Sequence, residues 1–415
     1  MGKTTRTSEP RLFTPSFAAI MAAQALSLLG MEILQFVLPL HLLALTGSGT
    51  LYGAVVALGN VPYLALAPVG GVIADRTRKR SVMAACDLAL AAGLVAYLSL
   101  SGTSALVPAT VVALMVSFAT QALYQPCAQS AMPLMVAPEL LEQAVAVTSQ
   151  VGMLTGIGGP VVGGIVYGLC GLAPIVVVSA ACFAGSAAVA IALVRVPYEP
   201  PERTAGALAT VRDDVGEALG FLRSRPAMWR VIAAATLVNL FGSSFFNVGS
   251  SYVVTQTLAL PSQLLGALQA ALAVGGLVGG AVVALRPGAL GLRSVPGLLG
   301  AVAGGIAAIS LVLAAPLPAL GAYAGLVVCY LASMAFCMAL SIVATSYLQR
   351  EAPETLTGKV MSLAMMLANL AAPLGQVAYG AAFDHVPAWV VAALASGATA
   401  VVAVWLRRGG RQREA

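Results

Sequence analysis

Charged residues are scarce in this chain, and their scarcity limits the solvent that can surround it. Only 9% of the 415 residues are Asp, Glu, Lys or Arg, whereas 60% are hydrophobic. A soluble domain carries charge on about 25% of its residues, because its surface faces water. The composition therefore excludes an ordinary water-soluble protein and predicts that most of the surface faces lipid.

Sequence features of catalysis and metal binding are also missing. None of the six cysteines forms a Cys-x-x-Cys pair or a Cys/His cluster, and all lie in or beside apolar stretches. We interpret them as small buried hydrophobic residues. Nothing resembles a Walker A loop, a zinc site or a nucleophile–base pair. The sequence therefore predicts no enzymatic activity, no cofactor and no bound metal.

Twelve apolar stretches are long enough, at about 20 residues or more each, to cross a bilayer as helices. They cover residues 17–45, 51–74, 82–101, 105–128, 144–169, 172–194, 230–257, 264–285, 294–315, 318–346, 361–383 and 387–406. A helix satisfies its backbone polar groups internally, as hydrocarbon requires. We therefore predict an all-α membrane protein with twelve transmembrane helices.

The Lys and Arg residues predict the orientation of these helices. All 21 fall in the two terminal segments or in loops that the order of the stretches places on the same side. Cytoplasmic loops are enriched in Lys and Arg. We therefore expect a multi-pass protein of the cytoplasmic (inner) membrane with both termini in the cytoplasm. The basic residues are spread over six segments, which argues against a nucleic-acid partner. The first apolar stretch is too long for a cleavable signal peptide.

The chain divides into two similar halves. The longest polar segment follows six apolar stretches, so we predict a six-helix bundle over 1–194, a cytoplasmic linker over 195–229 and a second bundle over 230–415. Within the linker, residues 211–222 have the pattern of an amphipathic helix on the membrane surface. A short Ala-Pro-Glu repeat precedes the fifth and the eleventh stretch. Such halves place a substrate site between them, near the bilayer midplane.

The loop after the second stretch carries a recognisable pattern. It resembles motif A of the major facilitator superfamily, and the match covers Gly71, Asp75, Arg76, Lys79 and Arg80, with Arg78 where the family usually has Gly. The resemblance implies the two-bundle major facilitator fold and a gate in which Asp75 and the arginines hold neighbouring helix ends together on the cytoplasmic side. Such charge-assisted bonds must break when the helix ends separate. A plain basic loop is the alternative interpretation.

The fifth stretch is rich in glycine. Its string Gly159-Pro160-Val161-Val162-Gly163-Gly164, preceded by Gly156, resembles motif C, the antiporter motif of drug-exporting members of that superfamily. The small residues also permit close helix contact, and Pro160 removes a backbone hydrogen bond. Together with other stretches, this string resembles the drug and siderophore exporter branch, which includes enterobactin exporters and macrolide efflux proteins. The resemblance implies export.

One acidic residue lies at the centre of a predicted helix. Glu32 is near the middle of the first stretch, where an ionised carboxylate costs about 2.5–3 kcal/mol. Such a residue could carry protons, and a cationic substrate could compete with the proton for the same carboxylate. Gln35 lies one turn further along the same stretch. A protonated structural residue paired with Gln35 is the alternative. We expect Asp87 to pair with the basic loop of motif A, and His41 and Asp384 to occupy the membrane interface.

Polar side chains form stripes on three predicted helices. The predicted cavity-lining residues are Gln24 in the first stretch, Asn239, Ser243 and Asn247 in the seventh, and Asn369 and Gln376 in the eleventh. Spacings of about four residues place the members of a stripe on one helix face. Phe36, Tyr63, Phe241, Phe245, Phe246, Met365 and Met366 could form an adaptable apolar wall, or face lipid.

These features favour one hypothesis about function. It is a proton-coupled antiporter that exports hydrophobic or cationic small molecules by alternating access, with protons, a small-molecule substrate and membrane lipid as partners, and a monomeric state. The alternatives are an exporter of one endogenous metabolite such as a siderophore, and a proton-coupled nutrient importer.

Overall fold

The computed structural model describes residues 12–194, 216–286 and 290–411 of the chain. In this part of the chain, twelve helical stretches are long and apolar enough to cross a membrane. The helices of the first half are α1 (Pro15–Thr46), α2 (Gly49–Arg76), α3 (Lys79–Leu100), α4 (Leu106–Ala131), α5 (Leu141–Cys170) and α6 (Leu172–Leu193). The predicted all-α fold is confirmed, and most helix ends lie within a few residues of the predicted ones.

The first stretch of the second half is divided by two π-helical turns. It runs through α8 (Pro226–Val238), a π turn at Asn239–Ser243, α9 (Ser244–Tyr252) and a second π turn at Val253–Thr257. The remaining helices are α10 (Ser262–Leu285), α11 (Val295–Ala314), α12 (Ala319–Glu351), α13 (Glu354–His385) and α14 (Ala388–Arg411). Short 3-10 turns lie at Met132–Leu134, Pro138–Leu140 and Leu292–Ser294.

Local sequence explains the tight connection between α1 and α2. Gly47 has a φ of 65°, a left-handed conformation that favours glycine, and its N–H donates to the carbonyl of Leu43 to end α1. Ser48 then caps α2 by accepting a hydrogen bond from the N–H of Leu51 at 3.2 Å. The chain therefore reverses direction within two residues.

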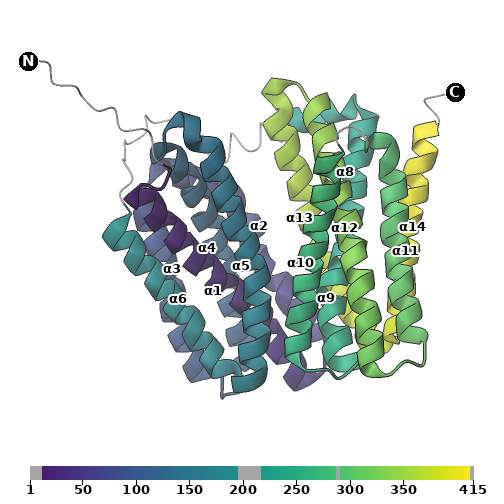
Figure 1. Ribbon diagram of the computed structural model, residues 1–415, viewed down its shortest axis with the longest axis horizontal. Helices are drawn as coiled ribbons and strands as arrows, with labels where there is room; N and C mark the ends of the chain where they lie inside the picture. The colour runs from purple at the N-terminus through teal and green to yellow at the C-terminus, as the bar shows by residue number, and fades with distance from the viewer. Residues whose placement is uncertain (1–11, 195–215, 287–289, 412–415) are drawn as a thin grey trace, which may run out of the picture.

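The helices form two bundles, α1–α6 and α8–α14, which stand side by side in Figure 1. The start of α1 and the end of α14 lie at the same end of the molecule, at the top of that view. We name this the terminal end; it also contains the α2–α3 connection. The opposite end, with the turn at Gly47 and the end of α13 at His385, is the distal end.

Small residues set the close spacing of helices within each bundle. A Cβ atom on Gly70 of α2 would overlap the carbonyl of Ala122 in α4. In the second bundle, Gly275 and Gly279 of α10 pack in the same way against the backbone of α12. Helices in lipid associate largely through such close packing, because lipid tails are as apolar as the side chains.

A short helix from the predicted linker packs on the second bundle. Residues 216–223 are helical, while 211–215 lie outside the described residues. Ala218 and Leu222 are buried in one cluster with Leu348 of α12 and Val360 of α13. Glu217 forms an ion pair with Lys359 at the start of α13. This segment therefore belongs to the terminal end of the second bundle.

Candidate functional site

The two bundles are joined at the distal end by hydrogen bonds that one carboxylate accepts. Asp384, near the end of α13, accepts from the hydroxyl of Ser48 at 2.9 Å and from the backbone N–H groups of Gly49 at 2.6 Å and Thr50 at 2.9 Å. These donors belong to the first turn of α2, whose positive dipole end favours an anion. Asp384 thus caps a helix of the opposite bundle.

Further contacts between the bundles lie below this cap. The Tyr52 hydroxyl of α2 is 2.9 Å from the hydroxyl of Ser251 in α9, and both residues are buried. The amide of Gln256 donates to the carbonyl of Leu43 at 3.1 Å, and Ser262 donates to the carbonyl of Gly164 at 3.1 Å. The distal ends of α1, α2 and α5 are therefore bonded to the second bundle.

Glycines bring the helix backbones together at two crossings. At the first, Gly53 of α2 lies against the carbonyl of Gln376 in α13, and a Cβ on Gly49 would stand 2.7 Å from the carbonyl of Gly380. At the second, a Cβ on Gly266 of α10 would stand 2.6 Å from the carbonyl of Pro160 in α5. We call these two crossings, with the hydrogen bonds above, the distal seal.

Glu32 lies close to the terminal side of this seal. Its backbone and Cβ pack directly against Gly159 of α5, next to Pro160 at the second crossing. The side chain is partly buried, and its carboxyl has no hydrogen-bond or ion-pair partner among the described residues. An unpaired carboxyl in this position can take up a proton or a cation.

Gln35, one turn along α1, joins a polar face of α4 rather than Glu32. Its amide donates to the hydroxyl of Ser117 at 3.2 Å and to the side-chain oxygen of Gln121 at 3.4 Å. The alternative interpretation, in which Gln35 pairs with Glu32, is therefore wrong for this conformation. The bonds connect the surroundings of Glu32 to α4.

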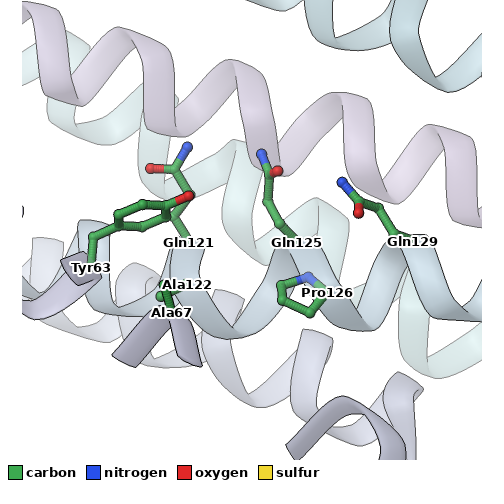
Figure 2. Close-up of a pocket in the computed structure, with 7 residues that line it drawn as sticks. All are labelled: Tyr63, Ala67, Gln121, Ala122, Gln125, Pro126 and Gln129. Carbon is green, nitrogen blue, oxygen red and sulfur yellow. The ribbon is translucent and has the colours of Figure 1, made fainter. Parts of the chain in front are cut away.

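A small pocket opens along that face of α4. It has a volume of about 180 Å³ and is lined by Tyr63, Ala67, Gln121, Ala122, Gln125, Pro126 and Gln129. Figure 2 shows the side chains of the three glutamines in a row along α4, on the same side of the helix, with the Tyr63 ring next to Gln121. The lining combines amide and phenol groups with small apolar residues and contains no charged side chain.

The second bundle contributes exposed polar residues from the π turn at Asn239–Ser243, from α9 and from α13. Ser243 and Asn247 are exposed, and they precede Ser251 at intervals of four residues, which place all three on one helix face. Since Ser251 contacts Tyr52 of the first bundle, this face is directed toward the first bundle. Asn369 is also exposed and lies two turns before Gln376, which is at the first crossing.

Comparison with known proteins decides what kind of molecule this is. Residues 20–376 match the pattern of the Major Facilitator Superfamily. The chain belongs to this superfamily. It is 24% identical over 373 residues to macrolide efflux protein A of Streptococcus pyogenes, and the alignment covers 87% of each chain. A member of the superfamily is a secondary transporter of small molecules, so the non-enzymatic nature of the chain is shown as well.

Solved structures agree in fold. A peptide transporter POT in complex with sulfate has a TM-score of 0.73 at 14% identity, over 98% of this chain and 96% of that one. A bacterial homologue of the iron transporter ferroportin, in an inward-facing state, has a TM-score of 0.72 at 17% identity, over 94% and 98%. These likenesses show the fold.

The superfamily's motif A lies at the terminal end of α2. The motif begins in α2, which ends at Arg76, and continues into α3, which begins at Lys79, so only Thr77 and Arg78 form the turn between the helices. Arg80 donates to the carbonyl of Val194 at 3.4 Å, which connects the turn to the end of α6. Gly71 has no neighbour within 4 Å of a Cβ position. The side chain of Asp75 lies outside the described part of the structure.

Motif C has two different surroundings along α5. Gly159 and Gly163 pack against α1, and Gly164 packs against α10 with 2.7 Å from its Cβ position to the carbonyl of Ser262. Gly156, by contrast, has nothing within 4 Å of its Cβ position. The part of the motif from Gly159 to Gly164 therefore packs α5 against α1 of its own bundle and against α10 of the second bundle. Its beginning, at Gly156, faces open space.

Three predicted site residues are placed differently from the prediction. Asp87 does not pair with the motif A loop: it is fully buried in α3 and accepts from Ser27 at 2.7 Å and from Ser186 at 2.6 Å. It therefore joins α3 to α1 and α6. Gln24 and Gln376, predicted to line the cavity, are buried at 5% and 7% exposure. Gln24 belongs to the inner packing of α1, and Gln376 to the distal seal.

Two residues of this superfamily member differ from the sequence prediction. Asp384 was predicted to lie at the membrane interface, and Gln129 was not singled out. Two features of the sequence indicate a role for Asp384. It follows the eleventh apolar stretch, on the side of the membrane where acidic residues are rare, and Ser48 before α2 is a residue type that caps helices. Asp384 and Ser48 come together only because α2 packs against α13.

Proposed function

We propose that this protein is a proton-coupled exporter of lipophilic or cationic small molecules. In this proposal it is a monomer in the cytoplasmic membrane, with the terminal end facing the cytoplasm. Glu32 is the observation that carries the proposal. Its carboxyl has no partner among the described residues and lies deep in the membrane-spanning region, between the distal seal and the polar face of α4. Protons and cationic substrate exchange at this group, because it binds one of them at a time.

The arrangement of the bundles supports alternating access. The distal seal closes the path beyond Glu32, and the hydrophobic clusters of the terminal end are separate for the two bundles. Rocking of the bundles would break the distal seal and bring the motif A turn of α2 against the second bundle. Asp75, Arg76, Lys79 and Arg80 would then hold the terminal end closed.

Two observations favour export over import. The relative in Streptococcus pyogenes is a macrolide efflux protein, similar over 87% of this chain. Motif C at Gly159–Gly164 is the motif of exporting members, and here it contributes backbone contacts to the distal seal. Import of a nutrient has no comparable support.

The experiment that tests this function replaces Glu32 with Gln in purified protein reconstituted in proteoliposomes. Radiolabelled erythromycin and tetraphenylphosphonium serve as substrates, with an imposed pH gradient as the driving force. Accumulation against the substrate gradient should fall by at least about tenfold in Glu32→Gln, because Gln cannot carry a proton. Downhill exchange should persist, which separates loss of coupling from misfolding.

The matched control is Glu351→Gln, which neutralises an exposed carboxyl at the terminal end of α12. It should accumulate both compounds at the level of the unaltered protein. Undiminished uphill transport by Glu32→Gln would remove Glu32 from the coupling mechanism. If only one class of compound inhibited transport, and no other cation was transported, the protein would instead be an exporter of one metabolite.

A further inference from the structure

Three glutamines form a polar row on a helix that is otherwise largely apolar. Gln121, Gln125 and Gln129 follow one another at intervals of four residues on α4, and Figure 2 shows them on the same side of the helix. At 1.5 Å rise per residue, the row is about 12 Å long. It runs from the neighbourhood of Glu32, reached through the Gln35–Gln121 hydrogen bond, toward the terminal end.

Most hydrogen-bonding groups of this row are unused within the protein. The amides of Gln125 and Gln129 and the hydroxyl of Tyr63 have no hydrogen-bond partner among the described residues. Gln121 is engaged by Gln35 alone, at the long distance of 3.4 Å. Gln129 is exposed, and Gln121, Gln125 and Tyr63 are half-buried, so the donors and acceptors of the row are accessible to a molecule that enters the pocket.

The chemistry of the pocket restricts its ligand. An amide offers two donors and an acceptor in one neutral group, so it complements hydroxyl, ether and carbonyl oxygens and does not neutralise a charge. The pocket volume of 180 Å³ is below the range of about 300–1,000 Å³ typical for whole drug-sized ligands. It can therefore hold one ring of a larger molecule.

We propose that Gln125, Gln129 and Tyr63 form a subsite for an uncharged, oxygen-rich ring of the substrate, such as a sugar or a lactone. This inference rests on the proposed function, and it names the class of substrate: an amphiphile with a cationic group for Glu32 and an oxygen-bearing ring for α4. The subsite gives specificity by hydrogen bonding, whereas Glu32 gives coupling.

The test measures equilibrium binding to purified protein in detergent, without any proton gradient. The two radiolabelled probes are erythromycin, a cationic lactone with two sugar rings, and tetraphenylphosphonium, a lipophilic cation without oxygen. Gln125→Ala and Gln129→Ala should each raise the Kd of erythromycin by about five- to tenfold, the loss of one or two hydrogen bonds. The Kd of tetraphenylphosphonium should change by less than about twofold.

Gln143→Ala is the matched control, because Gln143 is an exposed amide at the start of α5 outside the pocket, and both Kd values should stay unchanged. Equal weakening of the two probes, or no weakening of erythromycin, would overturn the subsite. Failure of the unaltered protein to bind erythromycin while it binds tetraphenylphosphonium would do the same. Because binding needs no coupling, these outcomes are independent of the Glu32→Gln transport result, which tests the proposed function.

Discussion

The distal and terminal ends of the molecule differ in how the two bundles meet. At the distal end, one hydrophobic core contains Leu43 and Tyr52 of the first bundle together with Phe245, Leu265 and other residues of the second. At the terminal end, the first bundle has a core of its own around Phe17 and Tyr124, and the second has another around Met228 and Leu348. The same helices are thus joined at one end and separate at the other.

The contacts at the distal end hold the two bundles together there. The distal seal combines glycine crossings, which need no side chain, with hydrogen bonds to Asp384 and between Tyr52 and Ser251. All of these contacts are noncovalent, so under the proposed alternating access the seal would open and close reversibly. The terminal end carries motif A, whose charged turn is suited to form the opposite closure.

A common measurement can compare the two ends. Spin labels at Ser104 and Leu317 report the distal distance between bundles, and labels at Glu139 and Glu351 report the terminal distance; all four residues are exposed. The labels require a background without the six native cysteines. The expected effect of each substitution below is given as a change in the ratio of distally closed to distally open molecules.

The largest expected effect comes from Gly53→Val, which would break the first crossing. The added side chain would overlap the Gln376 carbonyl, and overpacking of this kind costs about 2 kcal/mol, which is about a thirtyfold shift toward the distally open state. The distal label distance should lengthen and transport should fall. Gly93→Val is the control, since nothing lies within 4 Å of the Gly93 Cβ position. An unchanged distance distribution in Gly53→Val would show that the crossing does not limit opening.

Asp384→Asn should shift the same equilibrium by less. The carboxylate accepts three hydrogen bonds from the start of α2, but it is exposed, so screening by solvent reduces the effect to about 1 kcal/mol, about fivefold. The distal distance should lengthen, and added salt should reduce the difference between the variant and the unaltered protein. A variant that closes as tightly as before would remove Asp384 from the seal.

Asp75→Asn should act in the opposite direction. If motif A closes the terminal end, its loss favours the distally closed state by about threefold, because charge-assisted bonds of that closure are missing. The terminal label distance should lengthen while the distal distribution narrows. Combining Asp75→Asn with Asp384→Asn should bring the ratio back toward that of the unaltered protein. A shift toward the distally open state would contradict the proposed role of the motif.

Tyr52→Phe is the smallest change in this comparison. It removes one hydroxyl and its 2.9 Å contact with Ser251 while it keeps the ring in the shared core. Loss of one such bond costs about 0.5 kcal/mol, which is about a twofold shift toward the open state. Ser251→Ala should give the same shift, and the double variant should add nothing further. Additive effects would show that the two hydroxyls act separately.

The membrane-spanning architecture can be predicted from the sequence alone. The helix count follows from long apolar runs, because a helix is the simplest way to satisfy the backbone in lipid without distant partners. One connection is local as well: Gly47 ends α1 through its left-handed backbone conformation, and Ser48 begins α2 by capping it. The motif residues at Asp75 and at Gly159–Gly164 and the isolated carboxyl of Glu32 were also visible, because each departs from the apolar background.

The partner of each polar residue, by contrast, depends on the packing of the helices. Glu32 and Asp87 are both acidic residues in spanning helices, yet Asp87 accepts hydrogen bonds from two serines of neighbouring helices, whereas Glu32 has no partner in the part of the chain that the structure describes. Gln376 and Asn369 share a helix, yet one is buried in the distal seal and the other is exposed. Hydropathy measures how well a side chain tolerates lipid. The partner and the burial of a side chain depend instead on how helices that are distant in sequence rotate and cross. The bond from Asp384 to the start of α2 exists only because the two bundles meet at that end.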